Sequence, residues 1–265
     1  MRCLAIFLLS LLPAMAMADT LRMAVTTSFH NSGLSDVLLP AVEEDTSITV
    51  QLLVVGTGQA LRLGRAGDVD AVLVHARAAE EAFVAAGHTT HRREIMYNDF
   101  VVIGPAEDPA DIAGAESAGD ALRRIATSGA VFVSRGDESG THQKELELWF
   151  AAGLDPDGFG PAYRSVGAGM GATLNTASGM NAYLLADRAS WLNFGNKGDL
   201  ALLYAGDPAL FNQYAYLPVN PARHPHVPAD LTERLENWLA GPRAKTLING
   251  YMLNGEPLFT HNARN

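Results

Sequence analysis

The sequence has a single cysteine among its 265 residues, Cys3, which lies in an N-terminal apolar run. After that run the chain therefore offers no cysteine nucleophile, no thiolate metal ligand and no disulfide bond. Positive charge is also scarce, because 19 Lys and Arg stand against 29 Asp and Glu, for a formal net charge of −10. No block of basic residues occurs, so nucleic acid is not expected as a partner.

Long hydrophobic runs are confined to residues 1–18. Arg2 is followed by CLAIFLLSLLPAMAMA, and its end, Ala16-Met17-Ala18, has the small-x-small pattern of a signal-peptidase site. The run is too short to span a bilayer, and no later stretch is apolar enough to do so. We predict that residues 1–18 are a removed secretory signal and that the mature protein is soluble and exported to the periplasm.

The rest of the chain alternates between strand and helix patterns, with a globular composition that is 48% hydrophobic and 18% charged. Apolar stretches of the strand type, such as residues 20–28, 47–58 and 69–76, are each followed by a helical pattern. This alternation predicts an α/β fold with mostly parallel sheets. No repeat of fixed period and no low-complexity linker interrupts it.

Two extended, β-rich segments, Phe100–Gly104 and Tyr214–Val219, flank the middle of the chain. A chain that crosses to a second lobe and returns would use such segments as hinge strands. We therefore expect a two-lobed clamshell, with residues 19–100 and 217–265 in the first lobe and residues 101–216 in the second. A ligand cleft is expected between the lobes, where strand ends and helix starts converge.

Glycine and hydroxyl residues gather where four predicted strands meet the helices that follow. The four junctions read VTTSFHNSG, VVGTGQA, SRGDESGTH and VGAGMGATL. The first turn of a helix carries unpaired N–H groups and partial positive charge, and Ser and Thr add neutral donors. One such junction alone is usually a simple helix cap. Four junctions facing one cleft indicate a trap for a small oxyanion that needs little net positive charge.

The third junction, SRGDESGTH, is open to three interpretations. Ser139, His142 and Asp137 are the residue types of an exported hydrolase, but they are close in sequence, and no G-x-S-x-G elbow is present. An adhesive Arg-Gly-Asp tripeptide occurs commonly by chance. In an anion cradle, Arg135 would make a charge-assisted contact, Asp137 would brace it, and Ser139–Thr141 would present hydroxyls and amides.

The fourth junction also matches the sequence fingerprint of a dinucleotide-binding site. Gly167, Gly169 and Ala172 match G-x-G-x-x-A after a strand, and Asp187 lies about 20 residues further on. Because the pattern is short and lies in the middle of an exported chain, a loop of close approach to a ligand is the favoured interpretation. Further candidates for ligand contact are therefore Gly169, Met170 and Gly171.

The histidines do not indicate a metal site. Two close pairs, His88/His91 and His224/His226, lie in polar sequence without acids at ligand spacing, so solvated surface is the favoured interpretation, and no cofactor is expected. His75 differs, because it ends the apolar stretch VDAVLVHA. A core position and a cleft position are both open for it.

These motifs resemble, in order and spacing, the periplasmic tungstate-binding proteins of ABC transporters. The blocks that carry the resemblance are TTS, VVGTGQALRLGRAGDVDAVLVHA, MYNDFVVIGP, SRGDESGTH, GAGMGATL and AYLLADR, which extend from Thr26 to about Asn220. VGTGQAL and MYNDF are specific, whereas RGDESGT also resembles a loop of phosphate-binding proteins. In the opening motif, Val25 stands where the family usually has a threonine.

The resemblance implies a type II periplasmic-binding-protein fold that closes on a tetrahedral oxyanion without catalysis. The partners implied are tungstate or molybdate and the permease and ATPase of an ABC importer, and a monomer is expected. Ligand residues of the family fall on Thr27, Ser28, Thr57, Gly58, Arg135, Ser139 and Thr141, and Gly140 lies between the last two.

The protonation state of the anion helps to choose among ligands. Phosphate near neutral pH still carries a proton, so its binders supply a carboxylate acceptor, whereas tungstate and molybdate need donors only. A buried unpaired carboxylate beside a dianion is costly. In phosphate binders the acceptor follows the third strand, and here that place reads VHAR, with His75. Tungstate or molybdate is favoured; a phosphate or sulfate receptor and an exported hydrolase using Ser139 or Asp137 are the alternatives.

Overall fold

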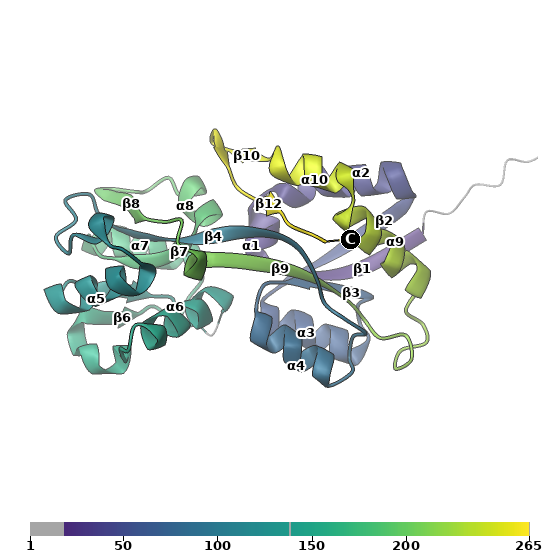
Figure 1. Ribbon diagram of the computed structural model, residues 1–265, viewed down its shortest axis with the longest axis horizontal. Coiled ribbons are helices and arrows are strands. Elements are labelled where there is room, and N and C mark those ends of the chain that lie inside the picture. Colours follow the sequence, from purple (N-terminus) through teal and green to yellow (C-terminus); the bar gives the residue numbers. More distant parts are fainter. Residues whose placement is uncertain (1–18, 138, 265) are drawn as a thin grey trace, which may run out of the picture.

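The computed structural model describes residues 19–137 and 139–264. The predicted signal, residues 1–18, lies outside the described residues. Figure 1 shows an elongated molecule with two parts, and β4 (Arg93–Pro105) and β9 (Phe211–Pro218) run from one part to the other. We call the elements before β4 and after β9 the first lobe, and the elements between them the second lobe.

The first lobe is built on the strands β1 (Asp19–Thr26), β2 (Ile48–Val55) and β3 (Ala71–Val74). β1 lies in the middle and pairs in parallel with both neighbours. Helices cover both faces of this sheet (Figure 1). They are α1 (Thr27–Asn31), α2 (Leu34–Thr46), α3 (Thr57–Ala66), α4 (Arg77–Ala85), α9 (Ala229–Ala240) and α10 (Pro242–Asn249). Because both faces are buried, β3 reads as the continuous apolar run AVLV.

The second lobe contains the parallel pair β5 (Phe132–Ser134) and β6 (Tyr163–Ser165). The strands β7 (Leu184–Asp187) and β8 (Leu200–Tyr204) pair antiparallel with the second half of β4. The helices of this lobe are α5 (Ala118–Ser128), α6 (Gly140–Ala151), α7 (Met170–Met180) and α8 (Arg188–Asn193). Short 3-10 turns lie at Ile112–Gly114, Pro156–Ala162 and Pro208–Leu210.

The chain ends beside the crossing strands. After α10, two short strands, β10 (Met252–Leu253) and β11 (Glu256–Pro257), form a hairpin. The last strand, β12 (Thr260–His261), then pairs antiparallel with β4. Gly241 and Pro242 separate α9 from α10, and Pro242 opens α10 at a position where its missing N–H costs no hydrogen bond.

The two crossing strands pair antiparallel with each other, from Arg93↔Tyr216 to Asp99↔Phe211. β9 then continues along β3, while β4 continues along β7 and β8. The expected α/β architecture is confirmed, with parallel pairing inside the strand–helix units. Antiparallel pairing is added by the crossing strands, because the chain returns through them in the opposite direction.

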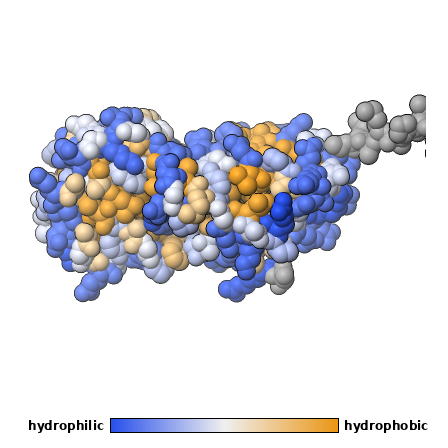
Figure 2. All heavy atoms as spheres, turned by 90° about the horizontal axis from the view of Figure 1, so that it is seen from above, coloured by the Kyte–Doolittle hydropathy of each residue, from blue (hydrophilic) through white to orange (hydrophobic). Residues whose placement is uncertain are grey.

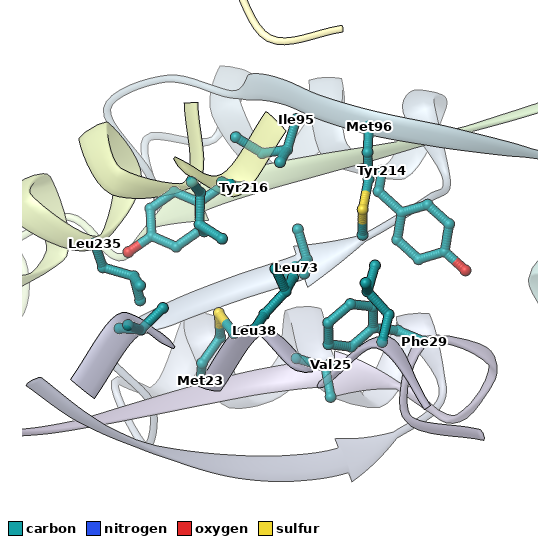
Figure 3. Packing of buried hydrophobic residues seen from close by; sticks show 14 of the residues in the cluster. Met23, Val25, Phe29, Leu38, Leu73, Ile95, Met96, Tyr214, Tyr216 and Leu235 are labelled. Atoms are coloured by element: carbon teal, nitrogen blue, oxygen red, sulfur yellow. The ribbon is translucent and has the colours of Figure 1, made fainter. Parts of the chain in front are cut away.

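The expected lobe boundaries, at 100/101 and 216/217, fall inside the continuous strands β4 and β9. Figure 3 shows Tyr214 and Tyr216 packed with Met23 and Leu73 in one apolar cluster, and all four side chains are buried. These two tyrosines therefore belong to the core of the first lobe. We propose that the second crossing ends before Tyr214, ahead of the boundary expected from the sequence.

Each lobe has its own apolar core on both sides of its strands. Trp149 and Trp191 are buried in the core, and Trp238 packs against the first-lobe core while its Nε1 donates to Asp45 at 2.7 Å. In the part of the chain that the structure describes, no helix is both long enough and apolar enough to cross a membrane.

Candidate functional site

Three of the four strand–helix junctions line one cavity of about 490 Å³ between the lobes, and the fourth reaches it through Gly169. The first junction contributes its hydroxyls from the start of α1, the second the start of α3, and the third the segment from β5 to α6. The predicted residues on this cavity are Thr27, Ser28, Thr57, Gly58, His75, Arg135, Ser139, Gly140, Thr141 and Gly169. Segments more than 100 residues apart in sequence thus meet at one place.

A neighbouring cavity of about 550 Å³ shares Thr27, Ser28 and Arg135 with the first. It is lined by the fourth junction through Met170 and Gly171. The two cavities form one cleft, and Arg135 lies where they join. All the residues singled out from the sequence as ligand contacts therefore line this cleft.

Simple capping explains only part of these junctions. Thr26 caps α1 by accepting a hydrogen bond from Phe29 N at 3.3 Å, and Ser139 caps α6 by accepting from His142 N at 3.3 Å. α3 and α7 begin instead at Gly56 and Gly169, which have no side chain to cap them. The first amides of those two helices are thus left to a ligand or to water.

Arg135 is paired with Asp137, as the sequence suggested. Arg135 Nη2 donates to Asp137 Oδ2 at 2.5 Å, and Asp137 Oδ1 accepts from the backbone N–H of Ser139 at 3.2 Å. Burial alone would raise the pKa of Asp137, but the hydrogen bonds from Ser139 and Arg135 outweigh it and lower that pKa. Arg135 Nε is buried and has no partner among the described residues. A donor on the one fixed charge of this loop is therefore available to an anion.

His75 lies in the cleft, which decides between the two positions left open by the sequence. Its Nε2 is 3.1 Å from Ser28 Oγ, and Ser28 Oγ is also 3.0 Å from Thr26 Oγ1 and 3.2 Å from Tyr214 OH. Burial lowers the pKa of His75 to about 4, so the ring is neutral at neutral pH. A ring N–H or Tyr214 OH can donate to Ser28, which leaves the hydroxyl of Ser28 free to donate into the cavity.

The Ser28–His75 contact is not a catalytic triad. His75 Nδ1 is buried with no partner at hydrogen-bond distance among the described residues, and the side chain that raises the pKa of the ring is the amide of Asn212, not a carboxylate. A triad needs a carboxylate at that nitrogen to orient the ring and to stabilise its protonated form. The two groups considered for a hydrolase are also engaged otherwise, since Ser139 caps α6 and Asp137 braces Arg135.

Among the residues that line the cleft and were not predicted as ligand contacts are Arg62, Asp187 and Asn31. Arg62, on α3, lies at the cavity shared by the first three junctions and is held by Gln59 through hydrogen bonds of 3.0 and 2.6 Å. Asp187 ends β7 and lines the second cavity with Arg135, and Asn31 lies there too. Asn31 lies within the first junction and Arg62 stands shortly after the second, so both had a local signal. Asp187 had been considered only for a dinucleotide.

Asp187 is a buried acid at the cleft. Its Oδ1 accepts from Ser190 N at 2.9 Å and so caps α8. Burial raises the pKa of Asp187, although the hydrogen bonds from Ser190 and the charge of Arg135 act in the opposite direction. The residue adds negative character on the side of Arg135 that faces α7 and α8.

The histidine pairs lie away from the cleft. His91 Nε2 pairs with Glu236 at 2.8 Å, and His226 Nε2 contacts the carbonyl oxygen of Gly67 at 2.8 Å. Within residues 19–137 and 139–264, no group of three or more His, Cys, Asp and Glu is placed to hold a metal ion.

Comparisons with known proteins agree with this architecture. Residues 15–243 match the model of the PBP superfamily domain. The chain is 44% identical to a tungstate-binding protein, TupA, of Peptoclostridium acidaminophilum over 91% of this chain and 85% of that protein. It is 45% identical to a putative ABC transporter anion-binding protein of Haloferax volcanii, over 92% of this chain and 72% of that one.

A solved structure of the tungstate-binding protein TupA from Desulfovibrio alaskensis superposes with a TM-score of 0.88 at 45% identity. The match covers 93% of this chain and all of that one.

Proposed function

Because the chain belongs to the PBP superfamily, we propose that it is a periplasmic solute-binding protein that captures tungstate, or molybdate, and delivers it to an ABC importer. The observation that carries the proposal is the convergence of Arg135 with the hydroxyls and glycines of three junctions on one cavity. The names of the relatives, tungstate-binding protein and anion-binding protein, support the same ligand class.

The composition of the cavity suits a fully deprotonated tetrahedral dianion. Its donors are neutral hydroxyls, helix-start amides and the guanidinium of Arg135. The acid on this cavity, Asp137, already accepts from Arg135 and Ser139, and His75 stands where the phosphate-binder motif carries its acceptor. A protonated anion such as hydrogen phosphate would therefore lack an unoccupied acceptor there.

The scarcity of positive charge in this chain is compatible with an anion ligand. Arg135 and Asp137 form an ion pair in the ligand-free cleft, so this loop adds little net charge there. Selectivity then depends on short-range geometry, because each donor is useful only at hydrogen-bond distance from an oxygen. Ligand-residue assignments to Thr27, Ser28, Thr57, Gly58 and Ser139–Thr141 are part of this proposal.

Competition calorimetry tests the proposal. The mature protein, residues 19–265, is titrated with tungstate, molybdate, sulfate, phosphate and vanadate, and tungstate or molybdate is expected to bind at least about 100-fold more tightly than phosphate. Equal affinity for phosphate would contradict the argument from acceptors. Turnover of a chromogenic ester or phosphoester panel would contradict the assignment as a binding protein.

A further inference from the structure

A buried acid, Glu145, lies behind the loop that carries Arg135. It belongs to α6 and is only 2% exposed, and its Oε1 accepts a hydrogen bond from Tyr163 OH at 2.5 Å. A carboxylate at such depth is costly unless it is paired and hydrogen-bonded. Glu145 lines neither cavity of the cleft, so it does not contact the proposed anion itself. Its position calls for another role.

The partners of Glu145 lie where β5 ends. Besides Tyr163, the side chain of Ser134 and the backbone of Arg135 interact with this carboxylate and lower its pKa. Glu145 itself stands four residues after Thr141, which is about one turn further along α6. Through Tyr163, which opens β6, this carboxylate links the helix whose first turn presents Ser139–Thr141 to the β5–β6 pair, and β5 ends just before Arg135.

Tyr163 connects the same point to the fourth junction. It opens β6, in which Ser165 is the parallel partner of Ser134. Just beyond β6, the N–H of Gly167 donates to the carbonyl of Arg135 at 2.8 Å. Gly136 has a φ of +60°, and a Cβ there would lie 2.8 Å from Cβ of Ser165, so the loop has little room to shift. The loop that carries Arg135 is thus supported by β6 and by the Glu145–Tyr163 hydrogen bond.

We propose that Glu145 is a positioning residue of the anion site: held by Tyr163, it fixes the spacing between Arg135 and the first turn of α6. The inference rests on the proposed function of the cleft, but the geometry it describes exists without a ligand. Its test therefore has one arm without an anion and one arm with tungstate.

Glu145 is also electrically coupled to the site. Burial raises the pKa of Glu145 to about 7, against the hydrogen bonds from Tyr163, Ser134 and the Arg135 backbone. Tyr163 on β6 is the titratable group hydrogen-bonded to it, Asp157 acts on Tyr163, and Arg135 at the end of β5 meets it through its backbone. A bound dianion raises the pKa of Glu145 further by like-charge repulsion. Binding near pH 7 should therefore be accompanied by proton uptake.

The first arm measures amide hydrogen exchange of the ligand-free protein. In Glu145→Ala, the segment 134–145 should exchange about tenfold faster than in wild type. The reason is the loss of the hydrogen bond that links α6 to β6, the partner strand of β5. Glu145→Gln should stay within about twofold, since its amide oxygen still accepts from Tyr163. Glu236→Ala, which removes a 5% exposed acid from the first lobe, is the matched control and should leave this segment unchanged.

The second arm measures tungstate affinity by calorimetry in buffers of different ionisation enthalpy. Glu145→Ala and Tyr163→Phe should weaken binding, by about tenfold and about threefold, with Glu145→Gln close to wild type. Proton uptake at about pH 7 should be smaller in Glu145→Gln than in wild type. Asp187 and His75 also face the cleft and can take up protons, so the difference between the two proteins isolates the part due to Glu145.

The outcomes separate the two proposals. Unchanged exchange over 134–145 in Glu145→Ala overturns the positioning role, whatever the protein binds. Equal affinity of wild type and Glu145→Ala also overturns it, whereas equal proton uptake by wild type and Glu145→Gln overturns the electrostatic coupling of Glu145 to the site. A third outcome is that exchange is faster in Glu145→Ala while the wild-type protein does not bind tungstate. That result supports the positioning of Arg135 by Glu145 and contradicts the proposed function instead.

Discussion

Gly140 and His75 meet across the cleft so closely that no larger residue fits at position 140. A Cβ on Gly140 would lie 2.9 Å from Cε1 of His75. The backbone of Gly140 is ordinary helix, so this glycine is required by space and not by conformation. His75 follows β3 in the first lobe and Gly140 opens α6 in the second, so the two lobes touch beside the proposed anion site.

Gly140→Ala should therefore hinder closure. The added methyl group must displace the imidazole or part the lobes, and tungstate affinity is expected to fall about tenfold with little change in thermal stability. Calorimetry gives the affinity and small-angle scattering the compactness of the anion-loaded protein. Gly179→Ala is the control, because nothing lies within 4 Å of a Cβ at that position of α7. Wild-type affinity in Gly140→Ala would show that the contact is irrelevant to binding.

Arg135 should be the most costly single residue to remove. Arg135→Ala takes away the guanidinium and leaves Asp137, its partner at 2.5 Å, without a counter-charge beside the dianion. We expect a loss of about 3 kcal/mol, or roughly 100-fold in tungstate affinity. Arg135→Lys should lose less, since it keeps the charge but not the planar fork. Titration calorimetry is the measurement, and near-wild-type affinity of Arg135→Ala would remove this residue from the site.

The hydroxyl of Tyr214 should matter for binding more than for packing. Tyr214→Phe keeps a fully buried ring but removes the group that lies 3.2 Å from Ser28 Oγ. Loss of one hydrogen bond predicts a cost of about 1 kcal/mol in tungstate affinity. Tyr216→Phe is the matched control, because Tyr216 OH donates to the carbonyl of Thr232 at 3.0 Å away from the cleft. It should lower the melting temperature and leave affinity unchanged; the reverse pattern would contradict the network.

Asp187→Asn should bind tungstate several-fold more tightly. Asparagine still caps α8, but the buried negative charge that faces Arg135 is gone. Weaker binding by Asp187→Asn would mean that the carboxylate contacts the ligand as an acceptor. Asp207→Asn is the comparison, since Asp207 caps the turn Pro208–Leu210 outside both cavities.

The same substitution has a predictable effect on stability. Burial raises the pKa of Asp187 above its unfolded value, so the folded state binds its proton more tightly than the unfolded state does. Stability from this group is therefore present at acid pH and is lost as the pH rises past the unfolded pKa. Asp187→Asn should gain in free energy of unfolding at about pH 8 and lose that gain at about pH 4. Denaturant melts at the two pH values measure it, and a gain that does not depend on pH would contradict the assignment.

Much of the candidate site could be predicted from the sequence, because the patterns that indicate it are local. Thr57, Arg135 and Ser139 stand at strand–helix junctions, and in each lobe such junctions lie at the ends of parallel strands and face the cleft. Tyr214 and Asp187 had no such signal. Tyr214 lies in the crossing strand β9, and Asp187 ends β7, which pairs with the other crossing strand, β4. The sequence around these two residues does not indicate that their side chains lie near the cleft.

The sequence by itself determined the alternation of strands and helices, the donor-rich helix starts and the single strong cation of the third junction. These are properties of short segments, fixed by side-chain periodicity and helix chemistry. Only the tertiary structure decided that His75 faces the cleft against Gly140, and that Glu145 lies beneath the Arg135 loop. Burial and pairing across 18 to more than 60 residues decide these roles, because a carboxylate or imidazole changes its charge and partners with its surroundings.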